Sequence, residues 1–349
     1  MSFKIADTNS FQKGARELPD GSSKNVYLAW DDTGKWVEGG TNSVALGSNA
    51  GKTGQQTNSV AIGANAGNEN QLEQSVAIGW QAGFKNQFEQ SVAIGAFSGN
   101  TSQKNKCVAI GLEAGNENQL EQSVAIGFQA GFKNQFEQSV AIGALSGNTS
   151  QGKQSVAIGW EAGKSNQGQH SVAIGLNAGK TVQQTNSVAI GANAVSGKTG
   201  QQTNSVAIGA NAVSGDAGQQ TNSVAIGANA GSVGQGEKSV AIGGSAAMNG
   251  QGSDCIAIGY NAVPIGFQPP GSFFIGKDCI RDAATASASN FLKFNTGTGE
   301  IAYDANLTNT ISTMQATISA MQATIDENKA TISAMQGTQN NETEPQPSS

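Results

Sequence analysis

Few of the residues that build a thick globular core are present in this sequence. Aromatic residues make up 6% of the 349 positions and charged residues 13%, whereas glycine alone occupies 47. A composition so poor in large apolar side chains argues against an ordinary globular protein of this length. Disorder is the usual alternative, but disordered low-complexity sequence does not return the same five residues at a fixed interval, as this sequence does.

Residues suited to catalysis or metal binding are equally scarce. His170 is the single histidine, so a histidine dyad or metal site has no second member. The three cysteines, Cys107, Cys255 and Cys279, are too few and too scattered for a disulfide framework. The first two replace a serine of the repeat and lie roughly 43 Å apart at about 4.8 Å per coil. We predict no enzyme activity, no catalytic or metal-binding residue and no cofactor.

Basic clusters and long apolar runs are also missing. The formal charge of −6 comes from scattered acidic residues, and no lysine or arginine cluster accompanies aromatic residues, so we expect no nucleic-acid partner. No stretch is long and apolar enough to cross a bilayer, and the first residues lack the apolar run of a secretory signal. We expect neither membrane insertion nor Sec-type export.

An internal repeat decides the fold class. The motif Ser-Val-Ala-Ile-Gly begins at Ser43, returns every sixteen residues as far as Ser187, and reaches its fourteenth copy at Cys255. Two later intervals are eighteen residues long, with extra pairs at Val195-Ser196 and Val213-Ser214. Because the motif is intact on both sides, we expect these insertions to lie in loops.

Each copy is predicted to form one coil of a parallel β-solenoid. Sixteen residues are too few for a helix-turn-helix unit, and Val-Ala-Ile reads as a strand with two distinct faces. A glycine follows each isoleucine or leucine, and a second follows four residues later in most copies, as corners require. Proline is absent between residues 43 and 259, as a backbone ladder requires. A degenerate fifteenth copy at residues 272–276 should end the array.

Side chains on each strand must alternate between two faces. Valine and isoleucine point to one side, and serine, alanine and glycine point to the other. Either the alanines fill a narrow interior and the larger residues form a stripe along the shaft, or the arrangement is reversed. Such a stripe favours association of identical chains. The second strand of each coil is polar, as in residues 70–74 and 86–90, so we expect it to face solvent.

A heptad pattern begins near Leu307. Its a and d positions are Ile311, Met314, Ile318, Met321, Ile325, Asn328, Ile332 and Met335. Isoleucine at every a position without leucine at d favours three strands over two, and Asn328 at a d position can fix register. We therefore predict a short trimeric coiled coil over residues 305–337 and a disordered tail over 338–349.

Two predicted hairpins flank the array, at residues 26–37 and 291–303, and either is suited to cap its end. The predicted domains are an N-terminal hairpin cap or attachment segment (1–40), the solenoid (41–280), a β connector (281–304), the stalk and the tail.

The unusual surface feature is aromatic. Its members are Trp80, Phe84, Phe88, Phe128, Phe132, Phe136 and Trp160. They are candidates for a receptor platform that recognises sugar or protein, or for padding of an interface between chains or of a corner.

The motif S-V-A-I-G-x-x-A-x, with asparagine or glutamine before the serine and a coiled coil behind, resembles the heads of YadA-like trimeric autotransporter adhesins over residues 41–263. This resemblance implies a left-handed parallel β-roll of 14–15 coils, three chains side by side, and adhesion to host matrix or cells. Asn328 is similar to the anion-binding layers of that family's stalks.

The signal peptide and membrane β-barrel anchor of that family are not seen in this sequence. The two hairpin segments, WDDTGKW and FNTGTGEIAYD, resemble segments in structural proteins of large DNA viruses and phages. We therefore expect a trimeric fibre or spike on a virion surface, or alternatively on another extracellular surface. Its expected partners are copies of itself, a host surface glycan or protein, and capsid proteins. The alternative function is a structural spacer or minor capsid-associated fibre that binds no receptor.

Overall fold

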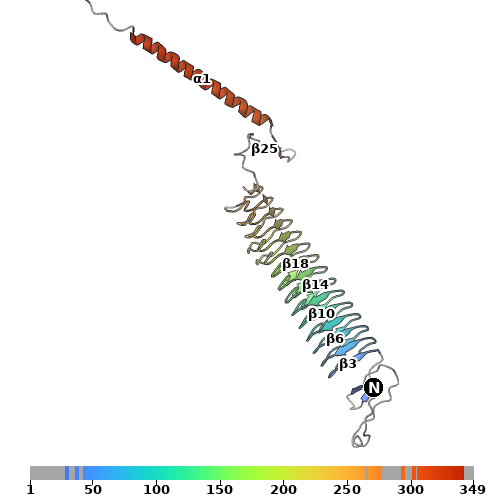
Figure 1. The fold of residues 1–349 in the computed structure, drawn as a ribbon. Helices are drawn as coiled ribbons and strands as arrows, with labels where there is room; N and C mark the ends of the chain where they lie inside the picture. The colour runs from blue at the N-terminus through green and yellow to red at the C-terminus, as the bar shows by residue number, and fades with distance from the viewer. Residues whose placement is uncertain are drawn as a thin grey trace, which may run out of the picture. The chain divides into compact units, whose positions relative to one another are not determined.

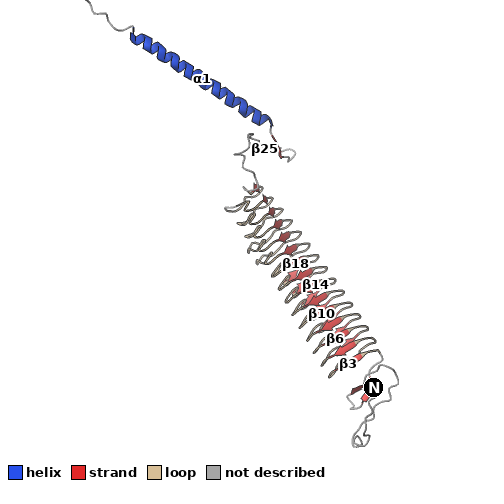
Figure 2. Cartoon of the chain, viewed as in Figure 1, coloured by secondary structure: helices blue, strands red, loops and turns tan. Residues whose placement is uncertain are grey.

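The computed structural model describes residues 28–30, 36–38, 42–263, 266–276, 292–294, 301–303 and 305–341. The chain divides into two units, residues 1–280 and 281–349, which are treated separately. The first contains a stack of coils that follow one another in chain order, as Figure 1 shows by colour. The second contains a long helix, drawn in blue in Figure 2.

The first strands of the coils form one parallel sheet of fifteen strands. They are β3 (Val44–Leu46), β4 (Val60–Ile62), β6 (Val76–Ile78), β8 (Val92–Ile94), β10 (Val108–Ile110), β12 (Val124–Ile126), β14 (Val140–Ile142), β16 (Val156–Ile158), β18 (Val172–Ile174), β19 (Val188–Ile190), β20 (Val206–Ile208), β21 (Val224–Ile226), β22 (Val240–Ile242), β23 (Ile256–Ile258) and β24 (Phe273–Ile275). Equivalent residues pair across neighbouring coils, as Val108 does with Val124. The predicted β-solenoid is confirmed, and its handedness stays a prediction.

The second strands form a parallel sheet of seven. They are β5 (Glu69–Gln71), β7 (Lys85–Gln87), β9 (Thr101–Gln103), β11 (Glu117–Gln119), β13 (Lys133–Gln135), β15 (Thr149–Gln151) and β17 (Ser165–Gln167). Single bridges between glutamines continue this ladder from Gln167 through Gln268.

The structure decides which face of the first strand points inward. The central alanine of every first strand from Ala61 to Ala257 is fully buried, as is the serine that precedes each of these strands from Ser59 to Ser239. The valines and isoleucines point outward and are half-buried or exposed. Small side chains therefore line a narrow interior, and each chain presents a Val/Ile face formed by the outward residues of its first strands.

The expectation that the second strand faces solvent was wrong for one residue in each coil. Its glutamine points into the coil and is buried, whereas a neighbour such as Asn118 is exposed. Nε2 of Gln119 donates to the carbonyl oxygens of Val108 at 2.9 Å and Ser123 at 3.2 Å. Because alanine and glycine leave a gap between the two strands, only a long side chain with a polar end spans it and satisfies the carbonyls there.

The two glycines of a coil are required by close contacts as well as by backbone conformation. A Cβ on Gly67 would lie 2.4 Å from Oε1 of Gln71, and the φ of Gly67 is +52°. A Cβ on Gly63 would lie 2.7 Å from the carbonyl oxygen of Gly79 in the next coil. Neither position accepts a side chain without moving a neighbour.

The extra pairs of the eighteen-residue coils lie in the turns between strands, as expected. Within these turns Val195 and Val213 are nevertheless fully buried, with φ values of 52° and 50°. Each takes the place of the second glycine, so the added length projects after it, where exposed Lys198 pairs with Asp216 at 3.1 Å. The valine side chain fills interior space that glycine leaves open.

The fifteenth copy pairs in register with the fourteenth, and Phe274 stands opposite Ala257. An aromatic ring thus occupies the position that alanine holds in the other coils. A ring this large does not fit the narrow interior beneath a further coil, which supports the expected end of the array here.

Both predicted hairpins contain antiparallel strand pairs. β1 (Leu28–Trp30) pairs with β2 (Trp36–Glu38), and β25 (Leu292–Phe294) pairs with β26 (Ile301–Tyr303). Their capping role stays a prediction, because the residues around them and Cys279 lie outside the described part of the chain.

The helix α1 (Ala305–Asn341) begins where the stalk was predicted and continues past Gly337. Its side chains over residues 310–336 are almost all exposed. Among the described residues, no helix has the length and apolar character needed to cross a membrane.

Modular stacking gives the first testable prediction. Deletion of residues 75–122 removes three whole coils and joins Gln74 to Ser123, so each ladder keeps its register. We expect a folded protein whose solenoid is shorter by about 14 Å, measured by small-angle scattering. As the control, deletion of residues 79–122 removes about 2.75 coils by length but joins Ile78 of one first strand directly to Ser123 before another, so no second strand returns the chain across the coil, and folding should be disrupted. Aggregation of the in-register deletion would contradict the modular fold.

Candidate interaction surfaces

Each coil has two turns that expose side chains at opposite edges of the solenoid. The first turn joins the first strand to the second, as residues 79–84 join β6 to β7. The second turn joins the second strand to the next coil, as residues 88–91 join β7 to β8.

The structure does not bring the seven candidate aromatic residues together on one surface. Trp80, Phe128 and Trp160 lie early in first turns, whereas Phe84 and Phe132 lie just before second strands. Phe88 and Phe136 lie in second turns, at the other edge. A single platform composed of all seven therefore does not exist within one chain, and each row must be considered separately.

The edge formed by the first turns carries an apolar row, called the first-turn row. It consists of Trp80, Phe97, Leu112, Phe128, Leu145, Trp160 and Leu176. Trp80 and Trp160 are 52% and 57% exposed, and the rings of Trp80 and Phe97 have centroids 4.6 Å apart. Sequence reasoning missed the leucines and Phe97, although they stand one or two residues after the first glycine of a coil, where a comparison of the coils would have found them.

The opposite edge carries the second-turn row, formed by Leu72, Phe88, Leu120 and Phe136. Each is followed by a glutamate, which gives a parallel acidic row of Glu73, Glu89, Glu121 and Glu137. Nζ of Lys104 lies 4.2 Å from the ring centroid of Phe88, between the two halves of the row. A shallow hollow of about 310 Å³ opens here, lined by Phe88, Lys104, Asn105, Leu120, Glu121 and Glu137.

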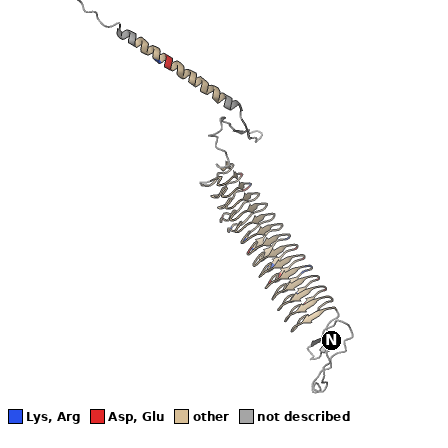
Figure 3. Ribbon diagram, viewed as in Figure 1, with Lys and Arg blue, Asp and Glu red and all other residues tan. Residues whose placement is uncertain are grey.

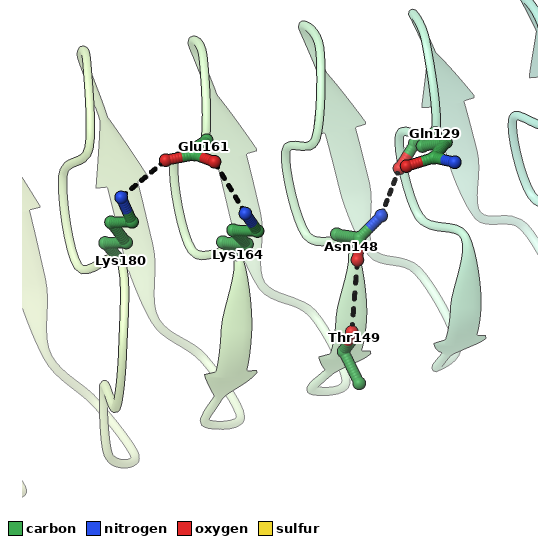
Figure 4. Close-up of polar contacts among 6 residues, drawn as sticks. All are labelled: Gln129, Asn148, Thr149, Glu161, Lys164 and Lys180. Carbon is green, nitrogen blue, oxygen red and sulfur yellow. Dashed lines mark hydrogen bonds and ion pairs between the residues drawn. The ribbon is translucent and has the colours of Figure 1, made fainter.

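Hydrogen bonds and ion pairs between coils fix the first turns. Nδ2 of Asn148 donates to the carbonyl oxygen of Gln129 at 2.9 Å in the preceding coil (Figure 4). Two later coils have lysine in place of this asparagine, and both lysines reach Glu161. Its carboxylate oxygens lie 2.5 Å from Nζ of Lys164 and 2.6 Å from Nζ of Lys180. These two hydrogen bonds hold the pKa of Glu161 below its ordinary value.

The two cysteines of the array are buried free thiols at the inward serine position. Sγ of Cys107 lies 2.8 Å from the carbonyl oxygen of Leu120. Burial raises the pKa of the Cys107 thiol, which keeps it protonated and unreactive. Their interpretation as serine substitutes is confirmed.

Other candidate chemistry is sparse in the residues that the structure describes. Within them, no three histidine, cysteine, aspartate or glutamate side chains gather in a way that could hold a metal ion. His170 is exposed in a second turn with a φ of 55°, at the surface position expected for it. Asn328 is exposed on α1, where its part in register or anion binding depends on partner helices.

Comparison with protein families detects YadA head domain repeats in the chain. The matched residues are 39–50, 55–66, 137–162, 167–194, 183–212 and 201–230. Each of these ranges includes at least one first strand of a coil. Neither the curated proteins nor the solved structures gave a match.

The ion pairs of Glu161 predict a pH-dependent stability. A carboxyl whose pKa is lowered in the folded state stabilises the fold above its ordinary pKa, and this contribution is lost as pH falls through the folded-state value. We expect Glu161→Gln to lower the melting temperature by about 1–3 °C at pH 7, and the difference to vanish in acid. Thermal unfolding followed by circular dichroism measures it. Glu89→Gln, at a carboxylate that forms no ion pair among the described residues, should show no such difference. A deficit that persists in acid would contradict this role.

Proposed function

We propose that this chain, which contains YadA head domain repeats, is a homotrimeric, adhesin-like fibre. In this proposal three solenoids lie side by side through their Val/Ile faces, and three copies of α1 form a coiled coil. The observation that carries the proposal is the outward Val/Ile face, because it leaves the large apolar residues of fifteen coils half-buried or exposed.

The helix supports association independently. Its seam residues Ile318, Met321 and Met335 are 60%, 54% and 60% exposed. Charge on the helix is confined to Asp326, Glu327 and Lys329, near its middle (Figure 3). A helix of 37 residues, about 55 Å long, with an apolar seam and so little charge is poorly suited to isolation in water. Partner helices in the predicted three-stranded packing would cover the seam, and Asn328 would then fix their register.

YadA-like heads are homotrimeric in their family and belong to adhesins. We therefore propose that this fibre attaches to a host surface glycan or protein. The adhesin-like repeats point to a structural, non-enzymatic protein at an extracellular surface. A virion surface with capsid partners is the setting we propose within that class. The second candidate, a spacer that binds no receptor, is favoured by the repetition of the first-turn row along many coils, which suits padding between chains.

The oligomeric state is the first test of this proposal. We expect the full chain to have a solution mass of about 106 kDa, three times its 35.4 kDa, by light scattering coupled to size exclusion. Ile318→Asn together with Ile325→Asn places polar groups in the seam and should weaken the trimer. Thr317→Asn, outside the seam of the same helix, is the matched control. A stable monomer of the unmodified chain would overturn the architecture.

The first-turn row separates padding from recognition. We expect Trp80→Ser, Phe128→Ser and Trp160→Ser, combined, to lower the melting temperature by more than about 5 °C, because each truncation removes apolar area buried between chains at about 25 cal/mol per Å². Phe84→Ser and Phe132→Ser should act in the same direction. Binding to host cells, or to a glycan array, is measured in parallel.

The control is the other edge, where Phe88→Ser and Phe136→Ser should leave the melting temperature nearly unchanged. Binding lost with unchanged stability in the first-turn variants would assign that row to a receptor and contradict its role as padding.

A further inference from the structure

We infer that the second turns of five consecutive coils form a docking surface for a cationic amphipathic α-helix of a partner protein. The surface consists of the second-turn row and its acidic row, with Lys104 between their two halves. It lies at the edge opposite the first-turn row, and the inference does not depend on how many chains associate.

The apolar half of the surface is confined to these coils. Phe136 is 43% exposed and Phe88 and Leu120 are partly exposed beside the hollow. In the next two coils the same position holds Gly152 and Gly168. Because the fold accepts glycine at this position, packing within the coil does not require the apolar side chains of the row.

The acidic row forms no ion pair within the described residues, although Lys104 and Lys106 lie in the coil between its two parts and Lys153 takes the equivalent position in the coil after Glu137. None of Glu73, Glu89, Glu121 and Glu137 has a lysine within ion-pair distance among the described residues. Other glutamates of these coils are paired, Glu69 with Lys85 at 3.6 Å and Glu117 with Lys133 at 3.3 Å. Glu73 and Glu89, and likewise Glu121 and Glu137, are one coil apart, about 4.8 Å along the stack, so the members of each pair repel one another. A cationic ligand relieves this repulsion while its apolar side covers the neighbouring row.

Backbone geometry favours a helix over an extended strand as the occupant. The backbone groups of these turns are already used between coils, as in Leu72 N–H to Gln87 O at 2.9 Å and Gln122 N–H to Asn105 O at 3.0 Å. A peptide strand would find no free ladder here and would leave its own backbone groups unpaired. A helix satisfies its backbone internally and contributes only side chains.

Spacing along the edge agrees with this choice. The row has two equivalent halves, Leu72 with Phe88 and Leu120 with Phe136, offset by three coils. At about 4.8 Å per coil its members lie at roughly 0, 5, 14 and 19 Å. Residues i, i+3, i+10 and i+14 of a helix lie at roughly 0, 4.5, 15 and 21 Å and share one face. The residue at i+7 would face Lys104, where glutamine or glutamate suits the contact.

The test uses the full chain and a designed probe. The probe is a fluorescein-labelled helical peptide of about twenty residues with leucine at positions 3, 6, 13 and 17, glutamate at 10, and lysines flanking the leucine face. Fluorescence anisotropy should show saturable binding that weakens steeply with added salt. Glu89→Gln with Glu137→Gln, and separately Phe88→Ser with Phe136→Ser, should each weaken binding by at least about tenfold.

Two controls keep the outcome decisive. Glu69→Gln with Glu117→Gln removes the same charge from the neighbouring coils, outside the surface, and should leave affinity unchanged. A peptide of identical composition with shuffled leucines should bind at least about tenfold more weakly than the probe.

Equal binding of the two peptides, or unchanged affinity in the surface variants, would overturn the inference. So would a change in solution mass of Phe88→Ser with Phe136→Ser, since it would assign the row to contacts between copies of this chain. Failure of the trimer proposal would appear instead as a monomeric mass of the unmodified chain, whatever the peptide does.

Discussion

The hydrogen bonds of the buried glutamine are the interaction on which each coil depends. Nε2 of Gln87 donates to the carbonyl oxygen of Val76 across its own coil at 2.8 Å and to Oε1 of Gln103 in the next coil at 3.2 Å. One side chain thus fixes the separation of the two strands and links successive coils. Its amide fits only because the second glycine leaves room, and the glycine in turn forces a corner with positive φ. Removal of either partner would leave a buried polar group or a gap.

An interior filled with serine, alanine, glycine and glutamine has a consequence for the exterior. Apart from a few valines such as Val195 and Val213, it has no room for large apolar side chains, so the other valines, the isoleucines and the aromatic rings lie on the Val/Ile face and in the turns. A globular protein would bury such residues within one chain, whereas this chain leaves them at its surface, which supports the proposed association of copies. The narrow interior that permits a coil of sixteen residues therefore also explains why the large apolar side chains lie at the surface, where they are potential interfaces.

The two edges of the solenoid differ in charge and in length, and different roles are proposed for them on this basis. The first-turn row is aromatic and aliphatic, carries little charge in its own positions and extends over seven coils, as contacts between identical copies require. The second-turn row is short and accompanied by unpaired carboxylates. Identical copies of an acidic row repel one another, so a partner of opposite charge suits this edge better.

The amino-acid sequence by itself determined the repeat, its parallel stacking, the corner glycines, both hairpins and the helix. These features follow from periodicity, from the absence of proline and from local conformational preference, which act within one coil or one helical turn. The heptad seam was also predictable from the sequence, because apolar residues recur at steps of three and four from Ile311 onward. Homotrimeric packing stays a prediction in both units.

Tertiary structure alone decided which face of each strand points inward. Alternation at period two gives two faces but does not say which one the chain closes around. Gln119 was misplaced for this reason, since its polarity suggested solvent, and the burial of Val195 within its turn was not foreseen. Both fill space beside small inward side chains. The seven aromatic residues fell into three rows because each position in a coil points in a direction set by closure of the coil. Closure brings together residues eleven positions apart, such as Gln119 and Val108, and no local pattern in the sequence encodes that distance.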